Sequence, residues 1–294
     1  MNINKEIEGV LKSDASNKKK RDNLSKLGLR PNDIKVLLSI YAKTGDSKTA
    51  IMLYTFGVEI ECFNVDKERF ISLATSKKIK IEAQRYNHDT QQVYKVVSDA
   101  SIVGEKAIEC VSPVLKGKKG LNSLKKVCDC LREAGAKVNK STGLHIHVGL
   151  DNIDFETYKN IFINYAMLEG AIDSFMSESR RGNNNRYCKS LENYLFYSQN
   201  VTPQNHDDIM EAFHGDRYCK VNPCSYARHK TIEFRQHQGT TDFEKINNWL
   251  NFLMKLIDYS KSNILAERIY TVNEIPFLTA TEKEYFNNRA TALS

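Results

Sequence analysis

The sequence of 294 residues has no hydrophobic run long enough to cross a membrane. A membrane-spanning helix needs roughly 20 consecutive apolar residues, and no stretch of this chain approaches that length. The opening residues, MNINKEIEGV, also lack the apolar segment of a secretory signal. We therefore expect a cytoplasmic protein without a membrane partner.

Several common motifs for phosphate binding and catalysis are also missing. The chain has neither a G-x-x-x-x-G-K-[ST] loop nor a G-x-G-x-x-G turn after a strand, two motifs with which proteins hold phosphates. It lacks the G-x-S-x-G nucleophile elbow and the H-E-x-x-H helix of metalloproteases. A nucleotide bound here must therefore be held by metal ions and basic side chains. We find no internal repeat and no low-complexity tract.

Cysteine is present in an odd number, seven, so the cysteines cannot all pair with one another. Cys128 and Cys130 form a C-x-C pattern in a stretch of helical character. Residues two apart on a helix point in different directions. We expect all seven to be reduced, structural thiols.

The formal net charge is +7, and part of it comes from a basic run near the N-terminus. A basic balance favours a polyanionic partner, either ATP or a nucleic acid. The run contains no aromatic residues, so it is more typical of a solvated segment, and nucleic-acid binding through it is the weaker interpretation. The run consists of Lys18, Lys19, Lys20 and Arg21.

Patterning along the chain predicts two parts, a helical N-terminal extension over residues 1–50 and a catalytic domain over residues 51–294. The second part shows short strands followed by helices, which indicates an α+β fold rather than a strict βαβ repeat. We expect residues 78–86 and 92–103 to form a hairpin around the turn signal NHDT. Helices are predicted at about 119–134, ending at Gly135, and from Asp154 to about 176.

Three predicted strands place chemically active side chains on one face and apolar side chains on the other. Residues two apart share a face of a strand and lie about 6.6–7 Å from each other. For any one of these strands, a water-facing sheet surface is the better explanation. The polar faces carry Glu59 and Glu61 in the first strand, His145 and His147 in the second, and Glu233, Arg235 and His237 in the third.

The three polar faces together favour a different interpretation. Carboxylates, imidazoles and a guanidinium that converge on one cleft would form a site for metal and phosphate. Glu109 in the segment IECVSPV, and Asp99 with Ser101 in VVSDASI, are further candidates. Each of these residues alone is typical of an ordinary surface position, and it becomes a candidate only together with the three polar strand faces.

Four segments in this order resemble the amidoligase family that is related to glutamine synthetase and glutamate–cysteine ligase. The resemblance covers about residues 55–260 and includes RYCKVN just ahead of the last segment. Two positions differ from the family pattern: Ala100 stands where the family has Gly, and Thr142 where it has Cys, which leaves the role of Asp99 open. The segments are GVEIE at 57–61, IECVSPVLKG at 108–117, STGLHIHVG at 141–149 and KTIEFRQHQGT at 230–240.

The resemblance implies a glutamine synthetase-like fold, a curved and mostly antiparallel sheet forming a half-barrel cleft backed by helices. It also implies an ATP-dependent carboxylate–amine ligase that makes an amide or peptide-like bond. ATP donates its γ-phosphoryl group to a substrate carboxylate, and an amine then displaces phosphate from the acyl phosphate. Such chemistry needs Mg²⁺ or Mn²⁺ on the phosphate oxygens and fixed positive charge at the transferring group.

Matched motif by motif, the resemblance also implies roles for individual residues. Glu59, Glu61, Glu109, His145 and Glu233 are expected to be metal ligands. Arg235, Glu233 and His147 are the expected catalytic residues. The nucleotide is expected to contact His147, Arg235 and Arg217, the last from RYCKVN.

Two other functions stay open at this point. His-x-His with carboxylates also binds zinc, so a metal-dependent hydrolase is one alternative. A basic nucleic-acid-binding module without catalysis is the other. The acid and amine substrates, small molecules or peptides, are not named by the sequence, and an oligomer is possible. The polar segment 177–229 is the expected lid, in which Arg180, Arg181 and Arg186 are candidates to hold a carboxylate.

Overall fold

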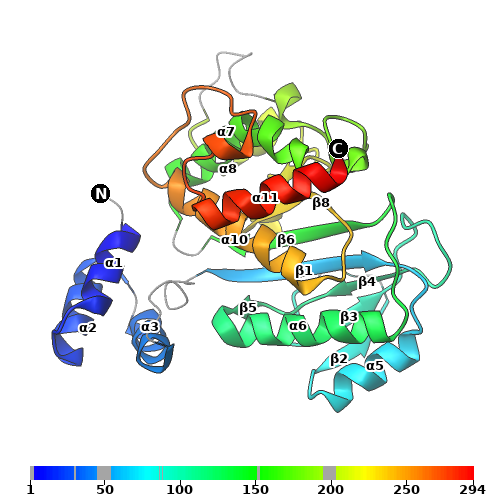
Figure 1. Ribbon diagram of the computed structural model, residues 1–294, viewed down its shortest axis with the longest axis horizontal. Coiled ribbons are helices and arrows are strands. Elements are labelled where there is room, and N and C mark those ends of the chain that lie inside the picture. Colours follow the sequence, from blue (N-terminus) through cyan, green and yellow to red (C-terminus); the bar gives the residue numbers. More distant parts are fainter. Residues whose placement is uncertain are drawn as a thin grey trace. The chain divides into compact units, whose positions relative to one another are not determined.

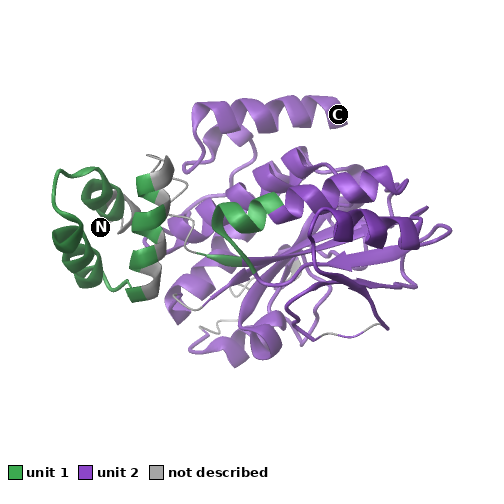
Figure 2. Ribbon diagram, turned by 90° about the horizontal axis from the view of Figure 1, so that it is seen from below, with its two compact units in different colours: residues 1–55, 115–122 green, residues 56–114, 123–294 purple. Residues whose placement is uncertain are grey.

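The structure, a computed structural model, describes residues 3–29, 31–44, 54–85, 87, 89–150, 153–194 and 203–294 (Figure 1). The chain divides into two compact units, coloured separately in Figure 2. One unit comprises Met1–Thr55 with Leu115–Asn122, and the other comprises Phe56–Val114 with Ser123–Ser294. The predicted boundary between residues 50 and 51 lies outside the described residues.

The N-terminal part of the first unit consists of three short helices with their own hydrophobic core. Lys18, Lys19 and Arg21 of the basic run are exposed on the second helix, whereas Lys20 donates to the carbonyl of Leu11 at 2.7 Å. The core is formed by Ile7, Leu11, Leu24, Ile34 and Leu37. The helices are α1 (Ile3–Lys12), α2 (Asn17–Lys26) and α3 (Pro31–Thr44).

The second unit is built on an open, mostly antiparallel sheet, which agrees with the predicted α+β class (Figure 1). Seven strands follow the order β2-β3-β4-β1-β6-β8-β7, and the short β5 lies off this path. The strands are β1 (Thr55–Cys62), β2 (Ile81–Ala83), β3 (Tyr94–Val97), β4 (Ile108–Val111), β5 (Leu115–Lys116), β6 (Gly143–Gly149), β7 (Val221–Asn222) and β8 (Thr231–Gln238).

The prediction of a hairpin between β2 and β3 is wrong, because these strands pair in parallel with Ile81 opposite Tyr94. A hairpin requires the chain to reverse at the end of the first strand. Here the Lys95 ammonium of β3 bonds to described residues of the connection. That ammonium donates to the carbonyls of Asn87 at 2.8 Å and Asp89 at 3.0 Å. Lys95 of β3 thus bonds to the loop that precedes its own strand.

Helices and short turns connect the strands. The helix predicted from Asp154 begins as expected, with the Asp154 carboxylate accepting from the Thr157 amide, and Gly135 follows α6 with a φ of +87°. Among the described residues, none of the helices combines the length and apolarity needed to span a membrane. The helical elements are α5 (Lys67–Ser76), α6 (Gly117–Glu133), α7 (Phe155–Ser174), η1 (Glu178–Arg180), η2 (Leu191–Tyr194), α8 (His206–Ala212), α9 (Ser225–His229), α10 (Phe243–Ser260), η4 (Val272–Glu274) and α11 (Ala280–Leu293).

The apolar face of the central strands is part of the core. Val58, Ile60, Ile146 and Phe234 are all fully buried, and Tyr165 of α7 contacts the Phe234 ring with centroids 5.8 Å apart. The seven cysteines are free thiols, and six of them are buried. Because side chains alternate along a strand, the polar residues between these apolar ones lie on the opposite face.

Candidate active site

Adjacent strands bring the predicted polar faces together. The strands β4, β1, β6 and β8 are consecutive in the sheet and antiparallel, so residues from distant segments face each other across the ladder. Cross-strand neighbours have Cβ atoms only about 4.5–5.5 Å apart. The facing pairs are Glu61 with Glu109, Glu59 with His145, and His147 with Glu233.

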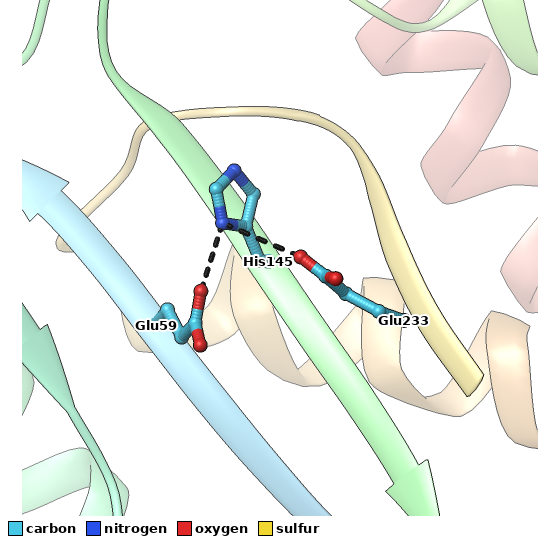
Figure 3. A group of neighbouring side chains, drawn as sticks. All are labelled: Glu59, His145 and Glu233. Atoms are coloured by element: carbon cyan, nitrogen blue, oxygen red, sulfur yellow. Dashed lines mark hydrogen bonds and ion pairs between the residues drawn. The ribbon is translucent and has the colours of Figure 1, made fainter. Parts of the chain in front are cut away.

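His145 lies at the centre of this group, with only 4% of its surface exposed. Its Nδ1 is 3.0 Å from Glu59 Oε2 and 3.8 Å from Glu233 Oε1, the two contacts drawn in Figure 3. Its Nε2 is 3.5 Å from Glu61 Oε1. One imidazole thus touches carboxylates from both sides.

Two overlapping sets of residues are spaced closely enough to hold a cation. Glu59, His145 and Glu233 form one set, and Glu61, Glu109 and His145 form the other. Within each set the ligand atoms lie within 4.8 Å of one another. All five residues predicted as metal ligands are therefore brought together.

The Glu61 carboxylate is fixed by the backbone at the start of β6, where its Oε2 accepts the Gly143 amide at 2.6 Å. A Cβ at Gly143 would lie 2.9 Å from His145 Nε2 and 3.2 Å from Arg180 Nη2, so a larger residue here would displace these side chains. Arg180 is itself buried and donates to the Thr142 carbonyl at 2.6 Å. Arg180, a candidate from the predicted lid, thus borders the cluster.

Glu233 is held from both sides by side-chain donors. Arg235 Nη1 lies 2.5 Å from Glu233 Oε1, and Asn222 Nδ2 donates to Oε2 at 2.5 Å. Burial raises the pKa of Glu233, but the charges of Arg235 and His147 outweigh burial and hold it below the usual range. Asn222 was missed by the sequence analysis, although it ends the motif RYCKVN that the analysis quoted.

His147 bridges the cluster and the adjoining α9. Its Nε2 is 3.3 Å from Glu59 Oε1, its Nδ1 is 3.0 Å from Thr231 Oγ1, and its ring meets the edge of His229 at 6.0 Å. Burial lowers the pKa of His147, but Glu233 and Glu59 raise it above the usual value. Neither Thr231 nor His229 was identified from the sequence. Thr231 is two residues before Glu233, on the same polar face of β8, so the alternation pattern could have found it, whereas His229 lies outside the strand.

Glu59 and Glu109 of the cluster differ in their proton affinity. Burial raises the pKa of Glu59, but hydrogen bonds to His145 and His147 hold it well below the usual range. Burial and the neighbouring charges of Glu59 and Glu61 raise the pKa of Glu109 well above that range. The cluster therefore holds more carboxylates than its own cationic groups neutralise.

The prediction that His237 shares the polar face is wrong. Leu144 pairs with His237 while Ile146 pairs with Phe234, so β8 has one extra residue between these pairs, a β-bulge. The bulge shifts the alternation, and His237 follows Leu144 away from the carboxylates. Its ring lies 5.9 Å from Trp249, where burial and nearby arginines lower the pKa of His237 to about 3.

The other candidate residues occupy different places. Arg217 lies over the Tyr218 ring at 5.0 Å, and the same ring is 5.9 Å from the Arg235 guanidinium. Arg186 lies over Tyr187 at 4.6 Å.

Arg181 and Asp99 have local partners instead. Arg181 donates to the carbonyls of Met176 at 2.9 Å and Leu293 at 2.8 Å. Asp99 accepts the Ser101 amide at 2.7 Å. The Asp99 charge is also near enough to Glu109 to contribute to the raised pKa of that carboxyl. The expected roles of Arg181 and Asp99 stay predictions.

One comparison with known proteins bears on this site. A family model described as "Putative amidoligase enzyme" matches residues 53–257, which is more than half of the chain and includes every strand of the cluster. A search of curated proteins finds no match.

Proposed function

Because the chain belongs to the amidoligase family, we propose that it is an ATP-dependent carboxylate–amine ligase. The family supports an enzyme of the ligase type, and the site chemistry favours the finer assignment. The γ-phosphoryl group of ATP passes to a substrate carboxylate, which gives an acyl phosphate and ADP. The amine then attacks the acyl carbon, phosphate leaves, and an amide bond remains.

The observation that carries this proposal is the convergence of four glutamates with His145 on neighbouring strands. Buried carboxylates are costly unless a cation balances them. Here the raised pKa of Glu109 shows that the internal balance is incomplete. The donor set, carboxylate oxygens with one imidazole nitrogen, fits a divalent cation.

Glu59, His145 and Glu233 would hold one cation, and Glu61 and Glu109 would hold a second beside it. Mg²⁺ prefers oxygen ligands, and the histidine makes Mn²⁺ an alternative. When bound, these metals neutralise charge on the phosphate oxygens and align the two reacting groups. The second set shares His145 with the first, so it relies mainly on its carboxylates.

The basic side chains near the cluster have separate tasks in this proposal. Arg235, anchored on Glu233, offers its guanidinium to the oxygens of the transferring phosphoryl group. His147 and Arg217 contact the nucleotide phosphates. Arg180 and Arg186, from the predicted lid, bind the carboxylate of the acid substrate.

Three further assignments accompany the function. We propose that the open sheet is the half-barrel of a glutamine synthetase-like fold. Residues 1–50 then form an accessory extension to a catalytic domain that begins at residue 51. The setting is cytoplasmic, where ATP and Mg²⁺ are abundant.

Calorimetry of ATP binding with Mg²⁺ or Mn²⁺ tests the proposal. Wild type is expected to bind ATP only with metal, and Glu233→Ala is expected to lose that binding. Glu82→Ala is the matched control, because Glu82 is an exposed strand glutamate away from the cluster. ATP binding that Glu233→Ala retains would contradict the site. If no metal supports ATP binding, the metal-dependent hydrolase becomes the better hypothesis.

A further inference from the structure

A four-residue repeat lies beside the candidate site. The tetrapeptide Arg-Tyr-Cys-Lys occurs at Arg186–Lys189 and again at Arg217–Lys220, a repeat too short for the sequence analysis to register. The two copies run in parallel: the Lys189 amide donates to the Tyr218 carbonyl at 2.8 Å, and the Lys220 amide donates to the Lys189 carbonyl at 2.9 Å. Their tyrosine rings meet edge to face at 5.2 Å.

Each copy supplies one backbone carbonyl to Arg235. The Lys220 carbonyl accepts the Arg235 amide at 2.8 Å, and the Tyr187 carbonyl accepts Arg235 Nε at 3.4 Å. One bond fixes the backbone of Arg235, and the other fixes the plane of its guanidinium. The position of this guanidinium therefore depends on both copies.

The final lysines of the two copies differ in their surroundings. Lys189 is partly exposed and pairs with Asp216 at 2.7 Å. Lys220 is fully buried, and its Nζ lies 2.7 Å from both Glu169 and Asp173 of α7. Burying a lysine is expensive, and two carboxylates one helical turn apart compensate for this cost.

The remaining oxygens of these two acids hold the segment that carries the first copy. Glu169 Oε2 accepts the Leu191 amide at 2.9 Å, and Asp173 Oδ2 accepts the Gly182 amide at 2.7 Å. Asp173 Oδ1 also accepts from Gln236, the residue after Arg235. One ion triad thus fixes both flanks of the first copy, the end of the second copy and the neighbour of Arg235.

We propose that Glu169, Lys220 and Asp173 are positioning residues that hold the Arg235 guanidinium in place for phosphoryl transfer. This assignment rests on the proposed function, because it gives Arg235 the transferring group as its target. Loss of the triad frees the two carbonyl acceptors of Arg235, whereas the carboxylate cluster on β1 and β4 keeps its own supports. We therefore expect variants of the triad to bind the transition state of phosphoryl transfer less tightly, while their affinity for the nucleotide is kept.

The test uses ADP alone and ADP with aluminium fluoride, a mimic of the transferring phosphoryl group, each with Mg²⁺. Calorimetry measures both affinities for wild type, Asp173→Ala and Glu282→Ala. Glu282 is the matched control, because it has similar exposure, pairs with Lys255 and accepts a backbone amide on α11. Aluminium fluoride is expected to raise the affinity of wild type for ADP. Asp173→Ala is expected to reduce this increase by about tenfold or more and to leave the affinity for ADP alone unchanged. Glu282→Ala keeps the gain.

A second measurement needs no nucleotide. Cys188 belongs to the first copy, is buried, and donates from its Sγ to the Arg235 carbonyl at 3.6 Å. Asp173→Ala is expected to increase the rate at which a thiol reagent labels Cys188 in the native protein, and Glu282→Ala is not.

The outcomes separate the two proposals. A wild type that binds neither ADP nor ATP overturns the proposed function and, with it, this assignment. Two results would overturn only the positioning role. In the first, aluminium fluoride raises the ADP affinity of Asp173→Ala as much as that of wild type. In the second, Asp173→Ala loses as much affinity for ADP alone as it loses of the increase from aluminium fluoride. A labelling rate of Cys188 that is unchanged in Asp173→Ala also overturns the positioning role.

Discussion

Two buried groups of charges in the second unit are built on opposite plans. In the ion triad, each carboxylate contacts the Lys220 ammonium and accepts a backbone amide. In the strand cluster, Glu61 faces Glu109 across the ladder, and the carboxylates crowd around His145. In the triad, the protein itself supplies the cation that the carboxylates contact, whereas the cluster places carboxylates next to one another. Like charges held close favour a cation from outside, which is why we propose the metal ions at the cluster and not at the triad.

The largest expected effect separates the triad from an ordinary ion pair. Lys220→Met leaves the buried Glu169 and the partly buried Asp173 without their cation, and we expect the free energy of unfolding to fall by about 3–5 kcal/mol. Lys189→Met, the equivalent change in the first Arg-Tyr-Cys-Lys copy, is the control and should cost less than about 1 kcal/mol. Urea unfolding measures both, and equal losses would remove the contrast.

Next in size is a change that acts on turnover rather than on folding. Arg235→Ala is expected to lower turnover about 100- to 1000-fold while metal affinity is kept, because the arginine stabilises the transferring group. Steady-state kinetics and metal calorimetry measure the two quantities. Arg132→Ala, which removes an exposed guanidinium that pairs with Asp129 on α6, is the control and keeps turnover. Loss of metal binding in Arg235→Ala would mean that its role is misassigned.

A smaller effect has the opposite sign in the strand cluster. Glu109→Gln removes one of several crowded carboxylates, so the metal-free protein should gain about 1 kcal/mol of stability while its metal affinity falls. Denaturant unfolding with and without Mg²⁺ measures the two effects. Glu82→Gln, at an exposed strand position, serves as the control. A loss of stability without metal would show that the cluster is balanced like the triad.

The smallest effect concerns pH. His237 is neutral when folded, with a pKa of about 3, and an unfolded histidine titrates near 6.5. The unfolded state therefore binds more protons between these values, so stability falls as pH falls from about 6.5 toward 3. His237→Gln should lose about 1 kcal/mol less than wild type between pH 6.5 and about 5.5. Exposed His214→Asn is the control, and equal slopes in wild type and His237→Gln would refute the prediction.

Alternation along β1 and β6, and along β8 as far as Arg235, was enough to predict which polar residues share a face. Since Glu59 and Glu61, or His145 and His147, are two apart, local geometry alone sets their direction. The sequence could not predict which strands are neighbours, and the resemblance to the amidoligase family implied only that their polar residues share one site. Only the ladder shows that Glu61 lies opposite Glu109.

Features that depend on tertiary contacts were missed. The bulge that redirects His237 leaves no mark in a pattern of alternating residues. Lys220 and Glu169 are ordinary charged residues in the sequence, and only the tertiary fold buries them. The repeated Arg-Tyr-Cys-Lys was visible in the sequence, and a search for exact short repeats finds it.

The bulge in β8 has a mechanical consequence. A regular strand sends its side chains in two directions, but here three consecutive residues reach three different partners. Arg235 points to Glu233, Gln236 bonds to Tyr165 and Asp173 of α7, and His237 lies against Trp249 of α10. A displacement of α7 would therefore reach the arginine through a single peptide unit, with no flexible loop to absorb it.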